Sequence, residues 1–164
     1  MGLFDFVTEA GSRLGGKIYD IAHKEDDLAE QARASAESLN KLRTNSITEN
    51  IEESGVLVEN LSVDVEDDKV TLGGKVNTQA CSEKLTLVAG NQRGVSRVDC
   101  QLEVSNPEPE ATLYTVKSGD TLSKIAKEFY GDASKYPVIF EANQPMLTDP
   151  NKIFVGQSLR IPQQ

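Results

Sequence analysis

The chain has 164 residues, and its 26 Asp and Glu outnumber its 17 Lys and Arg, which gives a net charge of −9 at pH 7. This length corresponds to one domain or to two small ones. The acidic balance argues against nucleic acid as a partner, because phosphate backbones are bound by basic side chains. Either the acidity only keeps the protein in solution, or it suits a small cation as the partner.

The N-terminal segment carries apolar residues at alternating spacings of three and four between Phe4 and Ile21, which predicts a helical seam. Gly11, Gly15 and Gly16 interrupt this seam, so short helical turns are expected rather than one rigid rod. Packing against another surface of the protein is the expected role of this segment.

The same segment lacks the basic start and the long apolar run of a secretory signal, and no stretch is long enough to span a bilayer. We therefore expect a cytoplasmic protein in which Cys81 and Cys100 stay reduced. Both fall on apolar faces and are expected to pack in the core, and whether they bridge on oxidation stays open. His23 is the single histidine, and phosphate loops, nucleophile elbows and zinc spacings are missing, so we expect a protein that is not an enzyme.

Alternation and capping patterns predict a helix, two strands, a helix and a strand in the middle of the chain, after a helix at residues 25–42. Ser46 and Glu49 form a capping-box pattern, which predicts the start of a short helix that stops at Gly55. The other elements are a hairpin of strands at 61–65 and 70–76, a helix at 79–89 and a strand at 95–104.

Two motifs flank the predicted helix at 79–89. Val70-Thr-Leu-Gly-Gly-Lys-Val76 completes the hairpin, and Gly94-Val-Ser-Arg-Val-Asp99 opens the last strand. With the αββαβ order, these motifs resemble a BON domain, which we place at residues 46–104. Residues 105–112 hold two prolines and two glutamates without an apolar pattern, which predicts an interdomain linker.

The last third of the chain, residues 113–164, is predicted to be a small βααβ unit. Its elements are a strand at 113–116, a helix at 121–130 with Asp120 as N-cap and Gly131 at its end, a helix at 135–143 with Ser134 as cap, and a strand at 158–161. Three stretches resemble a LysM domain: Tyr114-Thr-Val-Lys-Ser-Gly-Asp-Thr-Leu-Ser-Lys-Ile-Ala, Ile139-Phe-Glu-Ala-Asn and Pro150-Asn-Lys-Ile-Phe-Val-Gly-Gln-Ser-Leu-Arg-Ile-Pro162.

The resemblance to LysM implies binding of glycans that contain N-acetylglucosamine, such as peptidoglycan. Its groove would lie between Gly119, Asp120 and Thr121 on one side and the loop that begins at Asn143 on the other. A peptidoglycan binder without a secretory signal is a contradiction, so this function is the alternative rather than the first choice.

The α+β chain as a whole is similar to the small cytoplasmic BON–LysM proteins of bacteria, which include potassium-binding members. In this interpretation residues 1–45 form a helical segment that packs on the BON domain. The resemblance implies that a K⁺ ion is held by main-chain oxygens of two segments, namely those of Val7, Thr8, Ala10, Gly90, Gln92 and Val95.

Potassium places few demands on side chains, because rings of backbone carbonyl oxygens can replace its hydration shell. The last carbonyls of a helix have no intrahelical partner and carry its partial negative charge. The predicted turn at residues 90–95 follows such a helix end, although without the resemblance it would be interpreted as an ordinary turn. The hairpin residues Asp64, Glu66, Asp67 and Asp68 are expected to form a solvated acidic turn rather than a divalent-ion site.

A switch is the predicted mechanism, in which the ion closes the N-terminal segment and the BON domain, with or without LysM, into a compact monomer that acts as a potassium sensor or buffer. The ion can shift this equilibrium only by its differential affinity for the two states. A third alternative is an adaptor whose BON domain docks on phospholipid or protein.

Overall fold

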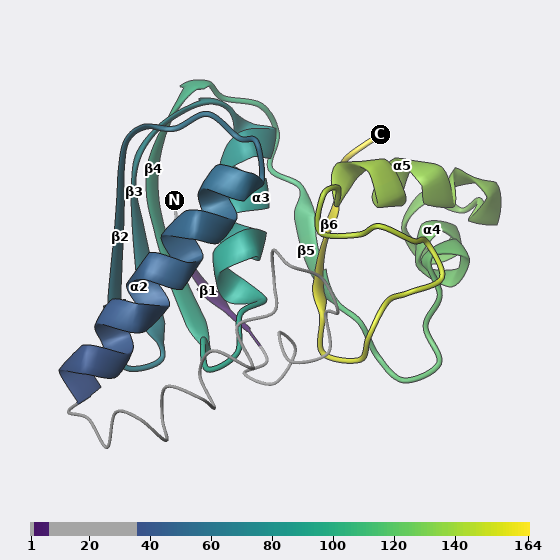
Figure 1. Cartoon of the computed structure of the whole chain (residues 1–164). Coiled ribbons are helices and arrows are strands. Elements are labelled where there is room, and N and C mark those ends of the chain that lie inside the picture. The colour runs from purple at the N-terminus through teal and green to yellow at the C-terminus, as the bar shows by residue number, and fades with distance from the viewer. Residues whose placement is uncertain (1, 7–35) are drawn as a thin grey trace.

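The computed structural model describes residues 2–6 and 36–164. In this part of the chain two α+β units lie next to each other, joined by a short extended connection, as Figure 1 shows. The predicted fold class is confirmed. The helices predicted within residues 7–35, His23, and the candidate ligands Val7, Thr8 and Ala10 lie outside the described residues.

A sheet with the strand order β1-β4-β3-β2 forms the first unit. Its strands are β1 (Leu3–Asp5), β2 (Glu59–Glu66), β3 (Lys69–Thr78) and β4 (Arg97–Asn106). The hairpin β2–β3 is antiparallel as predicted, and β4 runs parallel to β3, which requires the crossover through a helix that the sequence predicted. Helices α2 (Ala36–Glu53) and α3 (Gln79–Gly90) cover one face of the sheet (Figure 1).

The prediction of helical turns was wrong for residues 3–5 at the start of the chain, which form strand β1. Leu3 pairs with Asp99 and Asp5 with Arg97, so β1 is antiparallel to β4. The pairing covers an edge of β4 whose backbone groups would otherwise lack strand partners. Helical spacing of apolar residues was outweighed here by pairing with β4, whose partner residues lie 92 to 96 positions later in the sequence, and no local pattern reports such a pairing.

The predicted break between a helix ending at residue 42 and one beginning at residue 46 was wrong, because α2 is continuous from Ala36 to Glu53. Thr44 and Thr48 lie inside it, and their hydroxyls donate to the carbonyls of Asn40 and Thr44 at 2.9 and 2.8 Å. These polar side chains are thus satisfied within the helix instead of ending it. Ile47 and Ile51 are buried below the helix as predicted.

Helix α3 is the central helix of the molecule. The Thr78 side chain caps its first turn by accepting from the Cys81 N–H at 3.3 Å. Its apolar residues Leu85, Leu87 and Val88 are almost fully buried. Cys100, on the adjacent β4, is a free thiol with 3 % exposure, which confirms its predicted place in the core, while the Cys81 thiol is half-buried.

The second unit pairs β5 (Thr112–Thr115) with β6 (Ser158–Ile161) and packs α4 (Leu122–Tyr130), η2 (Ala133–Lys135) and α5 (Tyr136–Ala142) against them. Two predicted caps were wrong. Thr121, not Asp120, caps α4 by accepting from the Lys124 N–H, and Asp132, not Ser134, caps the second helical stretch. Gly131 ends α4 with φ +70° as predicted.

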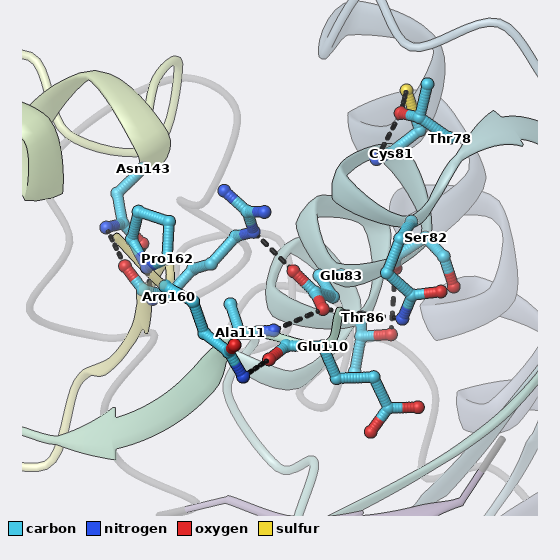
Figure 2. Close-up of polar contacts among 12 residues, drawn as sticks. Thr78, Cys81, Ser82, Glu83, Thr86, Glu110, Ala111, Asn143, Arg160 and Pro162 are labelled. Atoms are coloured by element: carbon cyan, nitrogen blue, oxygen red, sulfur yellow. Dashed lines mark hydrogen bonds and ion pairs between the residues drawn. The ribbon is translucent and has the colours of Figure 1, made fainter. Parts of the chain in front are cut away.

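The two units are joined by a buried ion pair. In Figure 2, Arg160 on β6 reaches across to Glu83 on α3, with the guanidinium Nε donating to the Glu83 carboxylate. The other carboxylate oxygen accepts from the Ala111 N–H at 2.8 Å, so Glu83 also fixes the connection between the units. The side chains of Arg160 and Glu83 are only 12 % and 8 % exposed.

Neither α2 nor any other described helix has the length and apolar composition of a bilayer-spanning helix.

Candidate functional site

The turn that follows α3 brings the three described candidate ligands together. Gly90 is the last residue of α3, and Gln92 and Val95 follow within five residues. All three are buried, with Gln92 at 0 % and Val95 at 1 % exposure. The Val95 N–H donates to the Gln92 carbonyl at 3.3 Å, and Gly94 adopts φ +81°, which closes the turn tightly.

Phe6 is the residue that connects the chain start with this turn. Its side chain is 8 % exposed, and a Cβ atom on Gly90 would lie within 3.0 Å of its ring. The Phe6 N–H donates to the Ser96 carbonyl at 2.6 Å, just beyond the turn. Glycine at position 90 therefore makes room for Phe6. This residue, which directly precedes Val7 in the sequence, lies beside the turn.

The last turn of α3 carries no basic residue. Helix carbonyls at this end bear a partial negative charge and lack intrahelical donors. Two of these carbonyls are satisfied locally: Leu87 accepts from the Asn91 N–H at 2.9 Å, and Val88 accepts from the Gln92 side-chain amide at 2.7 Å. The Gln92 Oε1 atom is buried, and no described residue donates to it. The partial charge of the helix end and this free acceptor favour a cation over an anion at this point.

Asn91 ties the same turn to the second unit, a role that the sequence did not reveal. Its side chain accepts from the Ser158 N–H at 3.0 Å and donates to the Ser158 carbonyl at 3.1 Å. Asn91 is 0 % exposed, whereas an Asn in a Gly-rich turn is usually interpreted as a surface residue. The turn after α3 thus contacts both the chain start and strand β6.

Arg43 on α2 braces the turn from a third side. Its guanidinium lies so close to Gly94 that a Cβ there would fall within 3.0 Å of it, and it donates to the Asp67 carbonyl at 2.8 Å. The turn therefore contacts α2 through Arg43, which also links α2 to the β2–β3 hairpin.

The acidic hairpin uses a carboxylate for structure. Asp68 accepts hydrogen bonds from the Ser96 hydroxyl and from Arg97, and the bond from Ser96 is the main cause that lowers the pKa of Asp68. Within residues 2–6 and 36–164, no group of three or more His, Cys, Asp or Glu side chains is arranged to hold a metal ion.

A cavity of about 300 Å³ lies in the second unit, at the start of α4. Its lining residues are Asp120, Thr121, Leu122, Ser123, Tyr136, Pro150, Asn151 and Ile153. Two predicted glycan residues, Asp120 and Thr121, therefore face it, while Gly119 is the adjacent loop residue. Asn143 does not line this cavity, because it is 2 % exposed and its amide is engaged with both backbone groups of Arg160 at 2.7 and 2.8 Å.

Asp120 shapes one wall of the cavity. Its carboxylate accepts from the Lys117 N–H at 2.8 Å and from the Tyr114 hydroxyl at 2.7 Å. These hydrogen bonds lower the pKa of Asp120, with the backbone bond from Lys117 as the larger cause. The bond to Asp120 raises the pKa of Tyr114 to about 12.

Family comparisons agree with these two units. The BON domain family matches residues 40–106, and the LysM domain family matches residues 114–162. Fold and matches together define a two-domain BON–LysM protein, and the exact boundaries predicted at residues 46, 104 and 113 stay predictions.

The chain is 40 % identical over 165 residues to the potassium binding protein Kbp of Escherichia coli, and the alignment covers 100 % of both proteins. The chain therefore belongs to the Kbp family.

Other relatives align with only a part of this chain. An uncharacterized protein of Deinococcus radiodurans is 37 % identical over 106 residues, which are 58 % of this chain and 41 % of that protein. Esterase Rv1288 of Mycobacterium tuberculosis is 55 % identical over 53 residues, which are 32 % of this chain and 11 % of the esterase.

Proposed function

We propose that this protein binds a potassium ion between the turn after α3 and the N-terminal segment. The observation that carries the proposal is the contact of Phe6 with Gly90, because Phe6 directly precedes the candidate ligand Val7 in the sequence. A relative aligned over the full length is named a potassium binding protein, which supports the same function.

The proposed ligands are main-chain oxygens of Val7, Thr8, Ala10, Gly90, Gln92 and Val95. Neutral carbonyl oxygens suit K⁺, because they replace a weakly held hydration shell without the charge density that Mg²⁺ and Ca²⁺ prefer. The partial negative charge at the end of α3 adds to the attraction.

Ion binding is proposed to act as a switch. Carbonyl dipoles that converge without a cation repel one another, so the N-terminal segment docks less firmly in the ion-free protein. Because the turn also contacts β6 through Asn91, we propose that closure at the turn changes how firmly the LysM domain packs against the BON domain. The ion can drive this change only if it binds the compact state more tightly. Equal hydrodynamic radii with and without K⁺ would contradict the switch.

Calorimetric titration tests the binding itself. K⁺ is titrated into protein dialysed free of it, with Na⁺ at matched ionic strength as control. The chain has no Trp, so calorimetry is preferable to intrinsic fluorescence. Saturable heat with K⁺ and none with Na⁺ is expected, and silence with both ions contradicts the proposal.

Glycan binding by the LysM domain is the second candidate, favoured by the cavity beside Asp120 and Thr121. Its polar lining and Tyr136 could accept a sugar ring and its hydroxyls. Pull-down on purified peptidoglycan at physiological salt tests this function.

Four further properties stay part of the potassium proposal: the cytoplasmic location, the monomeric state, the role as a sensor and the lack of enzymatic activity.

A further inference from the structure

Gln92 has a buried oxygen that the fold leaves without a donor. The side chain is 0 % exposed, and its amide nitrogen donates to the Val88 carbonyl at 2.7 Å. This bond fixes which end of the amide is nitrogen, because a carbonyl only accepts. Oε1 therefore remains as a buried acceptor without a partner among the described residues. Such a group is costly in a folded protein unless water or an ion satisfies it.

The location of this oxygen makes its isolation more unfavourable. The amide nitrogen of the same side chain donates to the Val88 carbonyl in the last turn of α3. Oε1 therefore lies near the negative end of the helix dipole. A further acceptor there is repelled by the helix carbonyls. A cation at this point satisfies the oxygen and the helix end together.

We infer that the Gln92 side-chain oxygen is itself a ligand of the bound K⁺, in addition to the main-chain oxygens of Gly90, Gln92 and Val95 in the same turn. This inference rests on the proposed potassium function and makes one ligand of the site depend on side-chain identity. Backbone ligands survive most substitutions, whereas a side-chain ligand is lost when its oxygen is removed.

Gln157 provides a matched control. It too is 0 % exposed with one unsatisfied atom, but that atom is the amide nitrogen Nε2, a donor that cannot ligate a cation. Its oxygen accepts from the Phe154 N–H at 3.0 Å. Replacing Gln157 therefore removes a buried amide of the same kind without removing an available oxygen.

Calorimetric K⁺ titrations of the full chain compare the wild type with Gln92→Met, Gln92→Glu and Gln157→Met. Gln92→Met is expected to weaken K⁺ binding about tenfold, the loss typical of one polar contact to a charged group. Gln92→Glu keeps the oxygen but loses the amide nitrogen, and it is expected to bind K⁺ at least as tightly as wild type. Gln157→Met is expected to keep the wild-type affinity.

Melting temperatures with and without K⁺ give a second readout. Gln92→Met is expected to shrink the stabilisation by K⁺, and Gln92→Glu to enlarge it, because its buried carboxylate destabilises the ion-free protein. If Gln92→Met binds K⁺ within twofold of wild type, Oε1 accepts from water and the inference is wrong. Equal losses in Gln92→Met and Gln92→Glu would assign the effect to the bond with Val88 and also overturn it. A wild type that does not bind K⁺ overturns the potassium function itself.

Discussion

Two glycine-containing turns in this protein sit at opposite ends of helices, and the comparison explains why they suit different ligands. The turn after α3 follows a helix C-terminus, is buried and presents oxygens. The turn at Gly119 precedes the N-terminus of α4, and Thr121 there is exposed. Helix C-termini favour cations and helix N-termini favour polar or negative groups. Burial adds a second difference, because buried carbonyls without donors need a ligand, whereas water can satisfy exposed groups.

The largest expected effect comes from the ion pair that joins the units carrying these turns. Glu83→Ala leaves Arg160 nearly buried without its partner, which is expected to lower the free energy of unfolding by about 3 kcal/mol. Urea unfolding measures the loss. The control is Glu103→Ala, whose pair with Lys75 at 3.6 Å is exposed and is expected to contribute about 0.5 kcal/mol or less. Equal losses in the two variants would show that burial of the Glu83 pair has no special effect.

The next effect separates the two turns directly. Gly90→Ala places a Cβ against the Phe6 ring, which is expected to displace the N-terminal segment, cost about 2 kcal/mol and abolish K⁺ binding. Calorimetry and urea unfolding measure the two consequences. Gly119→Ala is the matched variant, because its φ is +85° but no atom lies within 4 Å of the added Cβ. It is expected to cost about 1 kcal/mol of backbone strain and to leave K⁺ binding intact. Intact binding in Gly90→Ala would separate the ion site from Phe6.

A smaller effect is expected at the cap of α4. Thr121→Ala removes the hydroxyl that accepts from the Lys124 N–H, which is expected to cost about 1 kcal/mol. Thermal unfolding measures this loss, while the affinity for K⁺ is expected to stay at the wild-type value. A change in K⁺ affinity would mean that the two turns are more strongly coupled than their separate helices indicate.

The smallest effect is the pH dependence of the exposed turn. The pKa of Asp120 is lowered in the folded state, so its contribution to stability is present above its ordinary pKa of 3.8 and is lost as pH falls through the folded-state value. Tyr114, with its pKa raised to about 12, contributes stability below pH 10 that is lost as pH rises toward 12.

Tyr114→Phe tests this assignment. The variant is expected to remove the alkaline component of the unfolding profile and to weaken the acidic one, because Asp120 loses one of its two hydrogen bonds. Thermal unfolding between pH 3 and pH 11 follows both limbs. An unchanged alkaline limb in Tyr114→Phe would assign that limb to other groups.

Local patterns were sufficient for most of the described elements. Alternation predicted the β2–β3 hairpin, and helical spacing predicted α3 and α4. Gly90, Gln92 and Val95 were selected through the resemblance to the BON–LysM proteins. The structure places these three buried residues in one turn, and their role as ion ligands stays a prediction. Asn143 was selected for the glycan groove and instead anchors β6, because an Asn side chain has the same composition whether it binds a sugar or a strand.

The sequence by itself determined most of the described helices and strands, because caps, turns and apolar periods act over a few residues. Only the tertiary structure decided what the turn after α3 touches. Asn91 and Ser158 are 67 residues apart, and Glu83 and Arg160 are 77 apart, yet both pairs meet at one interface. The strand conformation of residues 3–5 and the fit of Phe6 on Gly90 arise in the same way. Such contacts depend on which surfaces the fold brings together, and no short-range pattern encodes them.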